Sequence, residues 1–170
     1  MSAMRHLFLD LEDSIITPVL EGWPNVHLIN VNKIRRVINE FKPDSLHIFS
    51  FAIWNELEKQ RFSMFVQERI ESALGMKLGL IPMVDVEIKH ACCNIMRISP
   101  SVVEFNDMSE FWSKQESFRL FSRFIFRNNW NNWQQEQHVM LLDDAVVDED
   151  FCFPKLHLTG TIRNIDEIGE

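Results

Sequence analysis

Short apolar runs that end in polar or acidic residues, separated by stretches with helical spacing, constrain the fold of this chain most strongly. Runs of this length are typical of buried strands, and apolar residues three and four positions apart are typical of helices. The strands are expected at 5–9, 46–49, 78–84, 139–142 and 156–162. The helices are expected at 33–41, 54–74, 85–96 and 109–127. This alternation predicts an α/β fold with a mostly parallel central sheet and helices on both faces.

Helix-capping residues mark the boundaries of these helices. Asn32, Asp85 and Ser109 are suitable N-caps, and Gly75 is suited to end the helix at 54–74. The remaining segments, 17–32 and 128–137 among them, are expected to be loops. A length of 170 residues predicts one domain over 1–170, with a frayed tail at 165–170.

Composition excludes several classes of protein. The net charge of -8 disfavours independent binding of nucleic acid, because phosphates would be repelled. No apolar run approaches the roughly 20 residues of a membrane-spanning helix, and the N-terminal apolar stretch is too short for a signal peptide. We therefore expect a cytoplasmic protein. The three cysteines have no metal-binding spacing and are expected to be small buried residues.

Acidic and hydroxyl residues follow three of the predicted strands. Asp10 and Glu12 follow the first strand, Ser50 follows the second, and Asp143 and Asp144 follow the run at 139–142. In a parallel sheet the carboxyl ends of the strands share one edge, where the binding site lies. Converging carboxylates repel one another unless a cation neutralises them, and hard oxygen ligands favour Mg²⁺. The pattern indicates magnesium-assisted phosphoryl transfer.

Four ordered segments resemble the motifs of the haloacid dehalogenase (HAD) superfamily. The first is the strand and acidic loop at 6–15, the second is His47-Ile-Phe-Ser50, the third is Lys114, and the fourth is the segment 139–148. The resemblance implies a single HAD-like domain with a Rossmann-like sheet. It also implies a nucleophile (Asp10), an acid/base (Glu12), phosphate-binding residues (Ser50 and Lys114) and Mg²⁺ ligands (Asp10, Asp143 and Asp144).

Three points remain open within this resemblance. Glu12 stands where most members of the superfamily have Asp, although the enolase-phosphatase branch also carries Glu. Lys89 competes with Lys114 for the role of the phosphate-binding lysine, and Asp148 is a secondary acidic candidate. Solvated acidic loops on an unrelated α/β domain are the alternative interpretation.

The spacing of the motifs leaves no room for a large cap domain. The segments between Asp10, Ser50 and Lys114 are only long enough for elements of the core itself. An open site suits a large substrate, such as a phosphorylated protein or a nucleic-acid end. The first hypothesis is therefore a capless, Mg²⁺-dependent phosphohydrolase that acts on a macromolecule through an aspartyl-phosphate intermediate.

A second group of residues indicates a surface for a macromolecular partner. Arg119, Arg123 and Arg127 recur every four residues on one helix, and Trp130 and Trp133 follow in a polar loop. A solvated basic face and tryptophans packed onto the domain are the alternatives.

The segments 8–18, 49–55 and 107–114 also resemble the Alc proteins of T4-like phages. That resemblance implies a bacteriophage protein that binds bacterial RNA polymerase in the host cytoplasm and shuts off host transcription, with little or no catalysis. Nucleic acid would then be contacted only within the complex. The two hypotheses differ in what Asp10 does, because only the enzyme needs its carboxylate.

Overall fold

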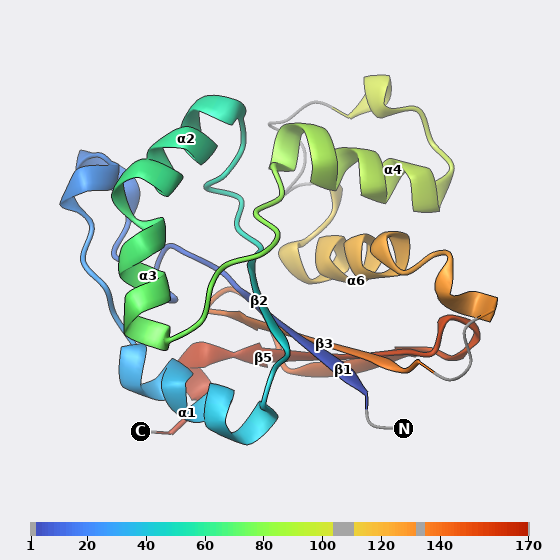
Figure 1. Ribbon diagram of the computed structural model, residues 1–170. Helices are drawn as coiled ribbons and strands as arrows, with labels where there is room; N and C mark the ends of the chain where they lie inside the picture. Colours follow the sequence, from blue (N-terminus) through green and yellow to red (C-terminus); the bar gives the residue numbers. More distant parts are fainter. Residues whose placement is uncertain (1–2, 104–110, 132–134, 170) are drawn as a thin grey trace.

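A five-stranded sheet forms the centre of the molecule in this computed structural model, which describes residues 3–103, 111–131 and 135–169 (Figure 1). The strand order is β2-β1-β3-β5-β4. The strands are β1 (Met4–Leu9), β2 (Ser45–Ile48), β3 (Gln137–Asp143), β4 (Glu149–Phe153) and β5 (Leu158–Asn164). Strands β2, β1, β3 and β5 are mutually parallel, and the edge strand β4 runs antiparallel to β5. The α/β class and the mostly parallel sheet are thereby confirmed.

Helices cover both faces of this sheet (Figure 1). The α-helices of the described residues are α1 (Val31–Phe41), α2 (Glu56–Phe65), α3 (Gln67–Leu74), α4 (Lys89–Met96) and α6 (Lys114–Ile125). Short 3-10 turns are η1 (Val19–Glu21), η2 (Trp23–Asn25), η4 (Pro100–Val102), η6 (Asn129–Asn131), η7 (Pro154–Leu156) and η8 (Ile165–Glu167), and η3 (Val84–Ile88) is a π-helical turn.

Alternation along the strands divides the core into two layers. Leu7 and Leu9 of β1 pack in one hydrophobic cluster with α1 and α3, whereas Phe8 between them packs in the other cluster with α4 and α6. Successive strand residues point to opposite faces, so each central strand must be apolar on both sides. This explains why the strand runs in the sequence are continuously apolar rather than alternating.

Several element boundaries differ from those expected. The helix expected at 54–74 is two helices, because the backbone leaves helical geometry at Val66. The strand expected at 78–84 is reduced to a single parallel bridge between Leu46 and Leu78. A Cβ at Gly79 would lie 2.7 Å from the His47 ring, so only glycine allows this close approach. Strand β4 was not expected, because its acidic start hides the strand pattern.

The helix caps also differ. Helix α1 begins at Val31 after Asn30, and not after Asn32. The expected cap Asp85 lies inside the turn η3. Ser113 caps α6 by accepting a hydrogen bond from the Glu116 amide, while Ser109 lies outside the described residues. Gly75 ends α3 in the left-handed conformation, as expected.

Part of the C-terminal segment, for which a frayed tail is expected at 165–170, forms the turn η8. Ile165 is fully buried, and Asn164 caps the turn η8 by accepting a hydrogen bond from the Asp166 amide. Of the cysteines, Cys92 and Cys93 are buried, but Cys152 is exposed on the edge strand, which corrects the expectation for that residue. Among the described helices, none is both long and apolar enough to cross a membrane.

Candidate active site

The candidate site lies at the carboxyl edge of the parallel sheet, on the left side of Figure 1. Leu9 pairs with Leu142 in the register of β1 and β3, and the Asp10 amide donates to the Leu142 carbonyl at 3.0 Å. Asp10 and Asp143 therefore leave adjacent strands at the same level. On the other side of β1, the Phe49 amide donates to the Leu9 carbonyl, which brings the chain at Ser50 to the same edge.

Three carboxylates and one ammonium group form the centre of the site. Asp10, Asp143 and Asp144 each present an oxygen within 4.8 Å of the others. The Lys114 Nζ lies 2.8 Å from Asp10 Oδ1 and 2.7 Å from Asp143 Oδ2. One lysine charge compensates only part of the charge of three carboxylates, so the cluster retains an excess of negative charge.

Lys114 is held in place by its helix and by two aromatic rings. It is the first residue of α6, and its Nζ lies 5.1 Å from the centroid of the Phe51 ring and 5.7 Å from that of Phe49. Burial alone would lower the pKa of Lys114, but the charges of Asp10 and Asp143 outweigh it and raise that pKa. Lys114 is therefore a charged residue of the site. Lys89, its competitor in the sequence, pairs with Asp85 at 3.7 Å.

The excess negative charge also changes the titration of the two carboxylates that follow β3. Burial raises the pKa of Asp144 to about 7, and contact with Asp10 and the charge of Asp143 add to this effect. Burial likewise raises the pKa of Asp143, against the opposing effect of Lys114. A divalent cation would remove the excess charge, and three carboxylate oxygens are the hard donors that suit Mg²⁺. The donor set therefore fits the expected metal.

Ser14 is a site residue that the sequence analysis did not select. Its Oγ donates to Asp10 Oδ2 at 3.1 Å and lies 3.4 Å from Asp144 Oδ1. A tight loop after β1 positions it, since the amides of Ser14, Ile15 and Ile16 all donate to the Leu11 carbonyl. The sequence signal that could have identified Ser14 is its position as a small hydroxyl residue four positions after Asp10.

The other predicted residues lie in different surroundings. Ser50 is buried, and its Oγ accepts the Ala52 amide at 3.1 Å, which leaves its own hydrogen available to a ligand. Glu12 Oε2 accepts the Val19 amide at 2.8 Å and so holds the following loop. Asp148 accepts the Asn164 amide at 2.8 Å, a structural role outside the carboxylate cluster.

The predicted partner-binding residues differ in their contacts, although Arg123, Arg127 and Trp130 are all exposed. Arg119 contacts Glu116 and Glu149, whereas Arg123 lies over the Phe153 ring and Arg127 over the Phe124 ring. Trp130 has 65% of its surface exposed. Trp133 lies outside the described residues.

The fold and this cluster define an α/β protein with a carboxylate–lysine centre at the carboxyl edge of its sheet. Comparison with protein-family models, with curated proteins and with solved structures found no match.

Proposed function

We propose that this chain is a Mg²⁺-dependent phosphohydrolase with a HAD-like fold, which cleaves a phosphoester of a macromolecule. The observation that carries the proposal is the position of the Lys114 ammonium between Asp10 and Asp143, with an Asp144 oxygen within 4.8 Å of both carboxylates. The sequence order of Asp10, Ser50, Lys114 and the Asp143–Asp144 pair matches the order of the motifs in that superfamily.

Asp10 is the nucleophile in this mechanism. One of its carboxylate oxygens forms a bond to phosphorus as the bond from phosphorus to the leaving oxygen breaks. A water molecule then attacks the same phosphorus, the bond to Asp10 breaks, and inorganic phosphate leaves. When bound, Mg²⁺ supplies positive charge that offsets the negative charge of the phosphoryl group and the carboxylates.

Three other side chains support these two steps. Lys114 and the Ser50 hydroxyl donate hydrogen bonds to the phosphoryl oxygens. Glu12 gives a proton to the leaving oxygen and later takes one from the attacking water. Since the Val19 amide occupies Oε2 of Glu12, this proton transfer uses Oε1.

We infer an open site, which suits a macromolecular substrate, from the elements that the described chain forms between the motif residues. The described chain between Asp10 and Ser50 forms the loop with η1 and η2, then α1 and β2. The described chain between Ser50 and Lys114 forms α2, α3, η3, α4 and η4. These elements belong to the sheet and the layers around it, so we propose a capless architecture. We also propose that the enzyme is cytoplasmic.

Hydrolysis of an aryl phosphate with and without Mg²⁺ tests the proposal. Asp10→Asn removes the nucleophile and is expected to reduce turnover at least about 10³-fold. Asp13→Asn is the matched control: Asp13 is exposed in the same loop, and its φ of 63° suits asparagine equally well. Turnover that survives in Asp10→Asn, or that needs no Mg²⁺, would contradict the mechanism.

A second candidate function is binding of bacterial RNA polymerase by an Alc-like phage protein. The exposed Trp130 favours it, because a tryptophan exposed near Arg127 offers the aromatic and basic contacts of a protein interface. Binding of purified polymerase separates the two candidates. The binding protein loses affinity in Trp130→Ala and is unaffected by Asp10→Asn, whereas the phosphohydrolase predicts no specific affinity for polymerase.

A further inference from the structure

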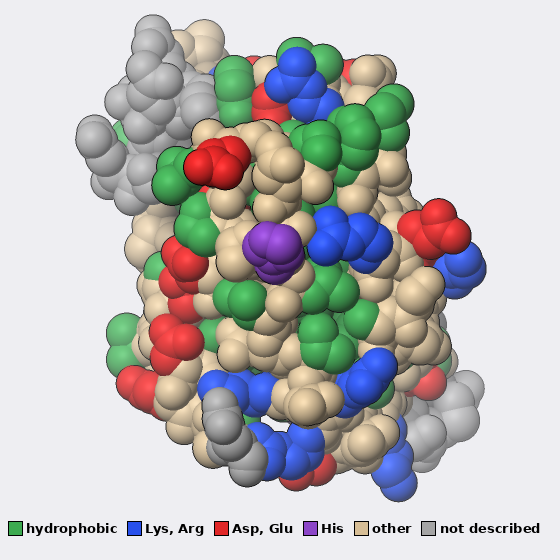
Figure 2. Space-filling view, turned by 90° about the vertical axis from the view of Figure 1, so that its left-hand side faces the viewer, with side chains coloured by type: hydrophobic (Ala, Val, Ile, Leu, Met, Phe, Trp, Pro, Cys, Tyr) green, Lys and Arg blue, Asp and Glu red, His purple; other side chains and the backbone are tan. Residues whose placement is uncertain are grey.

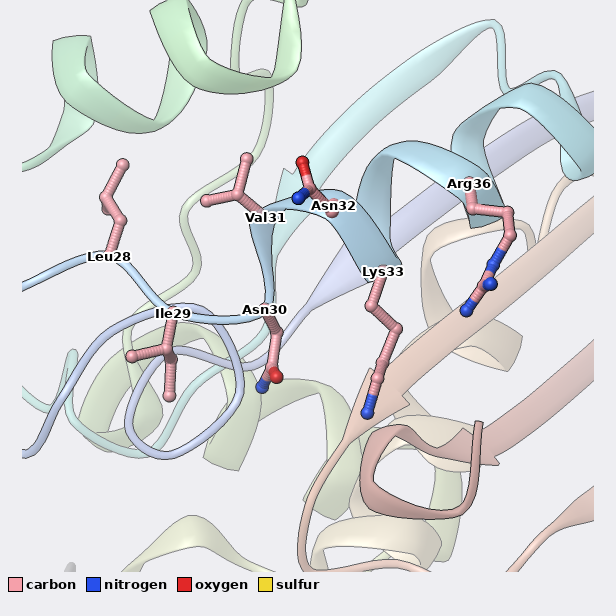
Figure 3. A pocket seen from close by; sticks show the side chains of 7 residues that line it. All are labelled: Leu28, Ile29, Asn30, Val31, Asn32, Lys33 and Arg36. Atoms are coloured by element: carbon pink, nitrogen blue, oxygen red, sulfur yellow. The ribbon is translucent and has the colours of Figure 1, made fainter. Parts of the chain in front are cut away.

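A pocket of about 470 Å³ opens at the start of α1, outside the carboxylate cluster. Its lining consists of Leu28, Ile29, Asn30, Val31, Asn32, Lys33 and Arg36. Figure 3 shows the side chains of Asn30, Lys33 and Arg36 extending to the same side of the chain. In Figure 2, basic side chains gather in the lower part of the face shown, the level at which α1 lies in Figure 1.

Two cationic side chains line this pocket, and the described part of the chain supplies neither with an acidic partner. Lys33 Nζ donates to the Ile165 carbonyl at 3.1 Å, and Arg36 Nη2 is buried with no hydrogen-bond partner in residues 3–103, 111–131 and 135–169. Among the described residues, neither side chain forms an ion pair with a carboxylate. A buried guanidinium nitrogen without an acceptor is energetically costly. In a chain with a net charge of -8, two cationic side chains that line one pocket without such an ion pair favour a ligand that is an anion.

The start of α1 adds to the positive electrostatic potential of this pocket. Its first turn contains no acidic residue, and no side chain caps it. Asn30 uses its side-chain amide elsewhere, donating to the Ser14 carbonyl at 2.9 Å. The amides of the first turn of α1 and the helix dipole therefore act together with Lys33 and Arg36, and such an arrangement suits a phosphate group.

The pocket adjoins the carboxylate site through Asn30. The loop residue Ser14 accepts the Asn30 side chain at its carbonyl, while its hydroxyl donates to Asp10 at 3.1 Å. Asn30 in the wall of the pocket is thus connected to the proposed nucleophile, Asp10, through the two hydrogen bonds of Ser14. A substrate that places one phosphate on Asp10 can extend toward the pocket.

We propose that this pocket binds a second phosphate group of the substrate whose phosphoester Asp10 attacks. The inference rests on the proposed function and narrows it to substrates that carry two phosphates. Arg36 and Lys33 donate to the oxygens of the second phosphate, and the α1 amides contribute the remaining donors.

Turnover of bisphosphates of straight-chain diols of increasing length, each compared with the monophosphate of the same diol, tests the inference. The protein is expected to prefer the bisphosphate about tenfold or more in kcat/KM once the chain is long enough. Arg36→Gln is expected to abolish that preference. Arg35→Gln is the matched control, since it removes the same charge from the neighbouring exposed position and is expected to retain the preference.

A second variant separates binding from folding. Asn32→Asp places a negative charge in the first turn of α1, which favours the helix dipole and is expected to raise the thermal midpoint slightly. The same charge repels a phosphate and is expected to remove the preference for the bisphosphate. A more stable variant with unchanged preference would overturn the inference.

The outcomes distinguish the inference from the proposed function. Turnover that depends on Asp10, without preference at any length, leaves the phosphohydrolase intact and overturns the second phosphate site. If no ester is hydrolysed, the proposed function fails. Calorimetric titration with pyrophosphate then tests, independently of hydrolysis, whether the pocket binds an anion. Binding that Arg36→Gln abolishes supports the pocket as an anion site, and absence of binding overturns it.

Discussion

At the scale of the residue, Lys114 organises the electrostatics of the candidate site. A positive charge at a helix N-terminus is unfavourable, and Lys114 is the first residue of α6. Its ammonium remains there because Asp10 and Asp143 lie within 2.8 Å of it. The side chains of all three residues are largely buried, so each charge depends on the others.

Lys114→Met tests this dependence by leaving two buried carboxylates without their counter-charge. The free energy of unfolding near neutral pH is expected to fall by about 3–5 kcal/mol. Asp143 already has a raised pKa, and loss of the ammonium raises it further. The folded variant then binds protons more readily than the unfolded chain, so it regains stability as the pH falls and loses it as the pH rises.

Urea unfolding at neutral and mildly acidic pH measures both effects. Lys89→Met is the matched control, because Lys89 is partly buried and pairs at 3.7 Å with the more exposed Asp85, an ion pair expected to contribute less than about 1 kcal/mol. Equal losses in the two variants would contradict the role of Lys114.

At the scale of the element, a chain of hydrogen bonds fixes β2 between its neighbours. The Leu80 amide donates to Nδ1 of His47 at 2.8 Å, and Ser45 Oγ lies 2.7 Å from both His47 Nε2 and His6 Nδ1. His6 Nε2 lies 2.6 Å from Oε1 of Gln137 on β3. Because the Leu80 amide can only donate, Nδ1 of His47 accepts, and the neutral His47 ring donates from Nε2 to Ser45 Oγ.

This chain predicts acid sensitivity through His47. Burial lowers the pKa of His47 from 6.5 to about 4, and the nearby His6 adds to the effect. A lowered pKa means that the unfolded chain takes up the proton first. Stability is therefore complete above pH 6.5 and falls as the pH drops toward 4, by about 3 kcal/mol at the lower limit.

His47→Asn is expected to reduce this pH dependence, because asparagine accepts the Leu80 amide and does not titrate. Chemical unfolding across that range measures the slope for the protein and the variant. His27→Asn, at an exposed position, should keep the slope of the unmodified protein. An unchanged slope in His47→Asn would show that other groups control acid unfolding.

Some elements of the fold are predictable from the sequence, and others are not. The strand at 5–9 is strongly marked, because a continuous apolar run stops at Asp10. The break at Val66 carries no Gly or Pro signal; α2 contacts η2 before the break, and α3 contacts α1 after it. Strand β4 depends on its partner: the Phe151 ring lies over Gly160 of β5, a contact between distant positions that no local pattern reveals.

At the scale of the whole molecule, the carboxyl edge of the sheet carries two regions of opposite charge. Asp10, Asp143 and Asp144 were predictable, because strand ends are local signals and the fold class places them together. Glu12 and Asp148 gave similar signals, but each accepts a backbone amide, and neither belongs to the cluster of three carboxylates. The basic pocket was not predictable, since Lys33 and Arg36 resemble any solvated pair on a helix until tertiary contacts set their surroundings.

If the carboxylate cluster binds Mg²⁺ as proposed, the stability of the whole molecule is expected to depend on that cation. A cation that binds only the folded chain stabilises it by about 1.4 kcal/mol at ten times its dissociation constant, which raises the thermal midpoint by about 3–5 °C. A proton on Asp144 competes with the cation, and the pKa of that carboxyl is raised to about 7. The shift is therefore smaller below pH 7 than above it. Thermal unfolding with Mg²⁺, compared with NaCl of equal ionic strength, measures this shift of the thermal midpoint. Asp144→Asn should lose most of the shift, and the control Asp148→Asn should keep it. Equal shifts in both variants would place the cation elsewhere.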